Sequence, residues 1–202
     1  GLSGRSCLLA LNKPIGISSH DVVNVVRRAF NERRVGHAGT LDPQASGVLL
    51  VCVGPATRLD AYLVGHGKRY RMGVTFGLST VTDDSEGEIT KELSVPDRIA
   101  EEEFAQNYVE HMVGQGMQVP PIYSAIKVKG KKAYEQARAG KVIDLAPRPF
   151  EIYDACLSEV RDTLRLDGKT GIEWVCEMSV SKGTYMRSLA RDMGRDLDCC
   201  AY

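Results

Sequence analysis

Apolar residues along the chain recur at two spacings, and each spacing predicts a different kind of element. The run at residues 7–12 predicts a short buried strand. Ser18 and Ser19 then offer caps for a helix, because a serine hydroxyl can accept a free backbone N–H at a helix start. Four apolar residues repeat with helical spacing after this start: Val22, Val26, Ala29 and Phe30. We therefore expect a strand followed by one amphipathic helix.

A glycine-dense stretch follows the helix and leads into the longest apolar run. From Val35 the chain carries two closely spaced glycines, an Asp42-Pro43 turn and a third glycine, followed by apolar residues 48–53. This pattern predicts a loop delivered onto a buried strand. The run is far too short for a membrane-spanning helix, which needs roughly 20 apolar residues. A second short helix is expected at 56–64.

Two later segments alternate as strands do. Residues 68–76 place Tyr70 on an apolar face with every second residue, and residues 174–180 repeat the pattern around Trp174. A last helix is expected to begin near Tyr185. Strands outnumber helices and do not alternate regularly with them. This order favours an α+β fold over a doubly wound parallel sheet.

Composition and charge add two charged segments to this picture. The 202 residues include 26 basic and 26 acidic ones, and the ordinary globular composition excludes a disordered or fibrous protein. Residues 83–103 carry a net charge of −7, and we expect a solvated hairpin and helix start there, in contact with nothing. Residues 127–148 carry +5 between prolines, which indicates an insertion that stands off the core.

Cysteines and histidines show no metal-binding or redox pattern. The six cysteines have no C-x-x-C spacing, and the four histidines form no H-E-x-x-H motif. No phosphate-binding glycine motif is present either. We expect a reducing compartment, cysteines that act as small buried hydrophobes, and no metal or cofactor.

Asp42 is the main candidate for chemistry, with two interpretations left open. Asp-Pro could simply make a turn. A loop anchored by an apolar strand could instead hold a carboxylate rigidly, as a nucleophile or an oxocarbenium stabiliser requires. Arg187 is a candidate partner that would keep Asp42 ionised, or else an exposed arginine on the helix surface. Tyr70 could be a core residue or a platform for a flipped base, and His37 could wedge between bases or be incidental.

Five ordered motifs resemble one enzyme family along the whole chain. The stretch GHAGTLDPQASGVL at 36–49 resembles the signature of the TruB family of tRNA pseudouridine synthases. Residues 11–21 and the KRYR at 68–71 are similar to the family's first and tyrosine motifs. Residues 120–140 resemble its RNA-gripping insertion, and residues 181–194 its arginine motif.

The resemblance implies a reaction and a set of site residues. It implies isomerisation of uridine 55 to pseudouridine in the T loop of tRNA, by base flipping and without cofactor or metal. Asp42 would be the catalytic aspartate, Tyr70 would stack on the uracil, and Arg187 would pair with Asp42. Nine further residues are expected to bind RNA or shape the pocket: His37, Gly39, Thr40, Lys13, Tyr185, Lys127, Lys131, Lys132 and Arg138.

The resemblance also implies an architecture and a setting. We expect a pseudouridine synthase fold, with a mixed, mainly antiparallel central sheet flanked by helices. Residues 1–202 would form one catalytic domain, short at its C-terminus, with a thumb-like RNA-binding insertion at 120–148 and no PUA domain. The expected partner is the tRNA T stem-loop, bound by a cytoplasmic monomer without membrane contact.

Two alternative functions compete with this interpretation. A non-catalytic tRNA-binding or tRNA-folding protein that retains the pocket would keep the basic insertion and bind RNA without forming pseudouridine. A small-molecule glycosidase would need a second carboxylate paired with Asp42, and no recognisable motif offers one.

Overall fold

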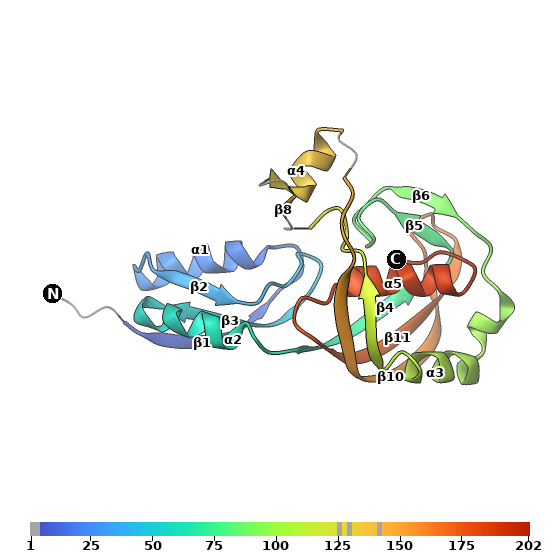
Figure 1. Ribbon diagram of the computed structural model, residues 1–202, viewed down its shortest axis with the longest axis horizontal. Helices are drawn as coiled ribbons and strands as arrows, with labels where there is room; N and C mark the ends of the chain where they lie inside the picture. Colours follow the sequence, from blue (N-terminus) through green and yellow to red (C-terminus); the bar gives the residue numbers. More distant parts are fainter. Residues whose placement is uncertain (1–4, 125–126, 129–130, 141–142) are drawn as a thin grey trace. The chain divides into compact units, whose positions relative to one another are not determined.

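The computed structural model describes residues 5–124, 127–128, 131–140 and 143–202. Contacts divide the chain into two compact units, Gly1–His66 and Gly67–Tyr202 (Figure 1). Each unit has its own sheet and its own helices. The single domain expected from the sequence stays a prediction, and the two units are described separately below.

The first unit is built on a three-stranded antiparallel sheet. Its order is β1-β3-β2, with β1 at Cys7–Lys13, β3 at Gly47–Val53 and β2 at Val35–Ala38. The central strand β3 carries the apolar run, so it is the most buried of the three. Its helical elements are α1 (Ser19–Phe30), the 3-10 turn η1 (Gly54–Leu59) and α2 (Asp60–Leu63). The strand after the glycine-dense loop and the short second helix are confirmed.

Two expectations for this unit were wrong in detail. The strand at 7–12 exists, but only alternate side chains are covered, and Leu8 is 44% exposed. Residues 35–38, which we expected in a loop, form strand β2 because they pair with the end of β3, Val35 opposite Val53. Glycine spacing alone did not reveal this edge strand.

Helix α1 begins where its serines predict. The Ser18 hydroxyl accepts the Asp21 N–H at 3.1 Å, and the Asp21 carboxylate accepts the Ser18 N–H at 2.9 Å, which completes a capping box. Asn31 ends the helix in the left-handed conformation with φ 47°. Val22 and Val26 face the core as expected, whereas Ala29 is exposed and Val23 takes its place in the core.

The second unit is built on a four-stranded sheet in which every pairing is antiparallel. The order is β4-β11-β10-β7 (Figure 1). Its strands are β4 (Lys68–Thr75), β11 (Thr170–Val180), β10 (Arg148–Leu164) and β7 (Gly114–Gln118). Alternation in β4 and β11 buries Val74, Trp174 and Met178, as the sequence predicts. The α+β class is confirmed.

Helices and short hairpins complete the second unit. Helix α3 (Glu102–Glu110) packs on β10, and α5 (Met186–Asp196), which follows Tyr185 as expected, packs on β4. The remaining elements are β5 (Leu78–Thr80), β6 (Ile89–Glu92), η2 (Asp97–Ala100), β8 (Lys127–Val128), β9 (Lys131–Lys132) and α4 (Ala133–Arg138). Lys129 and Lys141 of the basic segment lie outside the described residues. No helix in the described ranges is long and apolar enough to cross a membrane.

The acidic stretch at residues 83–103 forms ion pairs, although we expected it to contact nothing. A hairpin and a helix start do occur there, but the Asp83 carboxylate lies 3.0 Å from the Arg191 guanidinium. Glu92 pairs with Arg165 at 2.7 Å and with Lys169 at 2.9 Å. The basic partners of these carboxylates lie close to them in the fold but far away in the sequence. A local charge count could therefore not show these pairs.

Candidate active site

Asp42 lies in the loop that joins β2 to β3, half-buried, and the loop backbone is held on both sides of it. Leu41 exchanges two hydrogen bonds with the Ser19 hydroxyl, each at 3.0 Å. The Pro43 carbonyl accepts the Gly16 N–H at 2.8 Å, and the Asp42 carbonyl accepts the Ala45 N–H at 2.9 Å. The chain therefore presents this carboxylate on a fixed backbone rather than on a loose turn.

Lys13 holds the same loop through hydrogen bonds to backbone carbonyls. Its side chain is fully buried, and Nζ donates to the carbonyls of Ile17 at 2.7 Å and Pro14 at 2.8 Å, with Pro43 at 3.4 Å. Burial lowers the pKa of Lys13 below its ordinary value, while the nearby Asp42 carboxylate opposes that shift. The ammonium serves backbone carbonyls, so this residue shapes the loop and does not face solvent.

His37, Gly39 and Thr40 precede Asp42 on the same segment. His37 ends up half-buried in β2, and its Nδ1 lies 2.5 Å from the Gly39 carbonyl, which requires the proton on Nδ1. Gly39 has φ +75°, a conformation that glycine adopts at little cost, and it turns the chain from β2 into the loop. The first unit thus gathers five predicted site residues around one loop.

The remaining predicted residues lie in the second unit. Tyr70 sits on the core-facing side of β4, half-buried against the apolar cluster. Tyr185 is the N-cap residue of α5, and its N–H donates to the Gln118 side chain at 2.7 Å. Lys132 and Arg138 are exposed on the basic segment.

Arg187 is not an exposed arginine on the helix surface. Its side chain is 13% exposed, and it donates to the carbonyls of Thr82 at 3.0 Å and Tyr123 at 3.1 Å. The Asp84 carboxylate lies 3.9 Å away. Helix α5 thereby holds the turn after β5 and the segment after β7. Asp42 belongs to the first unit, so the expected Asp42–Arg187 pair stays a prediction.

Sequence reasoning missed several residues that hold these groups in place. Ser19 was seen only as a possible helix cap, and Asp84 only as part of a solvated acidic stretch. Gln118 belongs to no motif that suggested chemistry. In the described ranges, no group of three or more His, Cys, Asp or Glu side chains could hold a metal ion.

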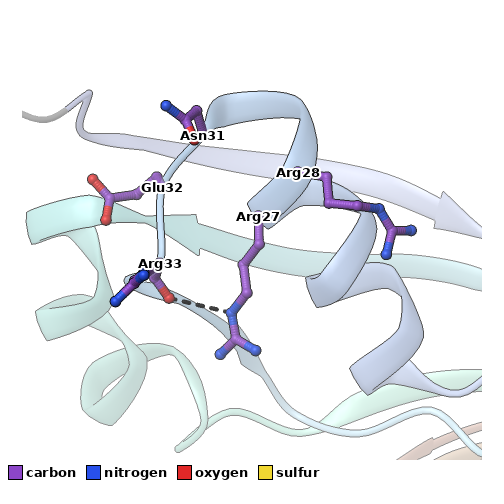
Figure 2. Close-up of a pocket in the computed structure, with 5 residues that line it drawn as sticks. All are labelled: Arg27, Arg28, Asn31, Glu32 and Arg33. Carbon is purple, nitrogen blue, oxygen red and sulfur yellow. Dashed lines mark hydrogen bonds between the residues drawn. The ribbon is translucent and has the colours of Figure 1, made fainter.

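An open basic hollow lies at the turn between α1 and β2. It has a volume of about 640 Å³ and is lined by Arg27, Arg28, Asn31, Glu32 and Arg33 (Figure 2). Arg27 is committed to the fold, because its guanidinium donates to the carbonyls of Arg33 and Val35, both at 3.2 Å. Arg28 and Arg33 are exposed. Arg28 and Arg33 therefore present positive charge at the surface of this hollow.

Comparisons with known proteins agree on one family. A model described as "TruB family pseudouridylate synthase (N terminal domain)" matches residues 27–186. The chain is 47% identical to tRNA pseudouridine synthase B of Thermosipho melanesiensis over 96% of its own length and 60% of that protein. It is 41% identical to the Pediococcus pentosaceus protein of the same name, over 93% of this chain and 62% of that one.

Solved structures show the same fold. The structure described as a Cbf5-Nop10-Gar1 complex matches with a TM-score of 0.64 and 26% identity, over 96% of this chain and 45% of that chain. The expectation of this fold, drawn from the sequence, is confirmed. The chain spans about 60% of the length of the curated relatives it matches.

Proposed function

We infer the function of this chain from one premise: it belongs to the TruB family of pseudouridylate synthases, whose model matches most of its length. We propose that it converts uridine to pseudouridine in tRNA, at uridine 55 of the T loop. The relatives it resembles are named tRNA pseudouridine synthase B. The observation that carries the proposal is the family's aspartate motif, folded here into a loop whose backbone is fixed on both sides of Asp42.

The proposed reaction is an isomerisation that needs no external reagent. The C1′–N1 bond of uridine breaks, the uracil turns within the pocket, and a C1′–C5 bond forms. The C5 proton leaves to solvent and N1 takes up a proton, so the product is an isomer of the substrate. Breaking the first bond builds positive charge on the sugar, and an ionised carboxylate stabilises that charge best when it is already in position. Asp42 acts either as a nucleophile at C1′ or by promoting a glycal intermediate.

The other roles follow from the resemblance and stay proposals. Tyr70 stacks on the target uracil and keeps the detached base from escaping, and Arg187 pairs with Asp42. His37 occupies the place of the flipped nucleotide, beside Gly39 and Thr40. Lys13 and Tyr185 shape the pocket.

Positive charge in two places supports an RNA partner. Lys127, Lys131, Lys132 and Arg138 belong to the segment that resembles the family's RNA-gripping insertion. Arg28 and Arg33 are exposed and form a second basic surface. They belong to the segment that precedes the Asp42 loop in the sequence. Such charges bind phosphates by releasing counterions, without regard to base sequence.

Replacement of Asp42 by Asn tests the proposal. A T stem-loop tritiated at C5 of its uridines should release tritium with the wild-type chain, and D42N should release it slower by roughly 10³-fold or more, because the amide cannot carry the negative charge. Affinity for the RNA should stay within about twofold. Asp162→Asn, an exposed aspartate on β10, is the matched control and should keep wild-type turnover.

Two results would contradict this account. Undiminished tritium release by D42N would remove Asp42 from the chemistry. A wild-type chain that binds the stem-loop and releases no tritium would favour the non-catalytic tRNA-binding function.

A further inference from the structure

Two adjacent serines at the start of α1 have different partners. Ser18 caps the helix through Asp21; Ser18 is half-buried and Asp21 is exposed. Ser19 is 3% exposed, and its hydroxyl turns away from the helix toward Leu41, 22 residues further along. Ser19 Oγ donates to the Leu41 carbonyl at 3.0 Å and accepts the Leu41 N–H at 3.0 Å.

These two bonds fix the backbone that leads into Asp42. The Leu41 carbonyl and the Asp42 N–H belong to one planar peptide group, so a bond to this carbonyl sets the orientation of the whole plane. The bond from the Leu41 N–H fixes the preceding plane as well. A single buried hydroxyl therefore holds both peptide groups that flank Leu41, and Leu41 itself is buried.

The opposite side of Asp42 is held by different groups. The Pro43 carbonyl accepts the Gly16 N–H, and the proline ring restricts its own φ. On the N-terminal side of Asp42, the Ser19 hydroxyl makes hydrogen bonds to both the N–H and the carbonyl of Leu41, the residue next to Asp42. Loss of this hydroxyl should therefore loosen the peptide group that joins Leu41 to Asp42 while the Pro43 side stays anchored.

We propose that Ser19 is a positioning residue for Asp42, acting through the Leu41–Asp42 peptide plane. This inference rests on the proposed function and extends it to a residue that touches neither the RNA nor the reacting atoms. A displacement of about 1 Å at a catalytic group can slow a reaction by roughly 10²-fold. The effect should fall on the chemical step, because the exposed basic residues that meet the phosphates are untouched.

The neighbouring serine supplies a matched control. Ser19→Ala and Ser18→Ala each remove one hydroxyl from the same helix start. Under single turnover at 25 °C with the tritiated T stem-loop, S19A should slow tritium release about 10- to 100-fold, with RNA affinity within about twofold of wild type. S18A should lower the melting temperature through the lost cap and leave the rate within about twofold. Equal rates for S19A and wild type would overturn the proposal.

Amide hydrogen exchange tests the same contact without any activity. The Leu41 N–H of the wild-type chain should be protected, and S19A should accelerate its exchange at least roughly 10-fold, toward the rate of an open loop. S18A should leave it unchanged. An unprotected Leu41 amide in the wild type would overturn the proposal, even if S19A failed to fold. A wild-type chain that releases no tritium while Leu41 stays protected would overturn the proposed function and leave the Ser19–Leu41 contact standing.

Discussion

The arginines Arg187 and Arg191 of α5 form hydrogen bonds and an ion pair inside the second unit. Arg191 is 10% exposed and Asp83 16%, and their charged groups lie 3.0 Å apart. Arg191 also donates to the Val119 carbonyl at 2.7 Å, next to the segment that Arg187 holds. One helical turn apart, the two arginines therefore fasten the turn after β5 to the helix.

Removal of Arg191 should destabilise the protein in a manner that depends on pH. Burial raises the pKa of Asp83, whereas Arg191 is the strongest of the charges that lower it, ahead of Arg187 and Arg195. Arg191→Gln leaves a buried carboxylate without its main cation, so the free energy of unfolding at pH 7 should fall by about 3 kcal/mol.

The sign of the pH effect follows from proton binding. A carboxyl group whose pKa is raised by folding binds protons more readily in the folded state, so its contribution favours folding at low pH and is lost as pH rises through the folded pKa. The deficit of R191Q in urea unfolding should therefore shrink between pH 7 and pH 4.5. The double variant D83N/R191Q should show little of this change. A deficit equal at both pH values would contradict the pair's role.

Residue types alone predicted some of these positions and not others. Asp42 stood out because a glycine-dense loop and an apolar strand surround it, and Arg187 because it begins a helix within a family motif. Ser19 did not, since nothing in the sequence distinguishes it from Ser18. The buried position of Asp83 could not be predicted either, because its partner Arg191 is distant in the sequence.

At the scale of elements, periodicity worked where one face of an element meets a core. Strands β4 and β11 alternate because each buries one face, and α5 repeats its apolar residues every four positions for the same reason. Strand β2 escaped prediction because it has four residues, one a glycine, and gains its conformation from pairing with β3. Pairing between distant segments leaves no local pattern to detect.

Charge gives the clearest result at the scale of the whole molecule. Residues 1–66 hold seven basic and four acidic side chains, a net of +3, so residues 67–202 carry a net of −3. Residues 27–34 hold four arginines and one glutamate, which equals the whole excess of the first unit. A zero net charge therefore conceals a basic surface, and binding of RNA responds to the local field rather than to the total.

Neutralising the exposed arginines should weaken RNA binding and its salt dependence. The double variant R28Q/R33Q should reduce the slope of log K against log salt by about 1 to 2 units, because up to two phosphate contacts are lost. The matched control, R98Q/R161Q, removes two charges that carboxylates already neutralise. The affinity of each double variant for a tRNA transcript, measured at several salt concentrations, gives the two slopes. Equal slopes for the two double variants would contradict the assignment of this surface.

The most direct test of the central claim is to map pseudouridine in a tRNA transcript treated with the 202-residue chain. Carbodiimide modification followed by primer extension locates each pseudouridine as a stop. We predict one stop, reporting uridine 55 of the T loop, with wild-type protein and none with Asp42→Asn. No stop with the wild type, or stops scattered over several loops, would contradict the claim that this chain isomerises a single uridine.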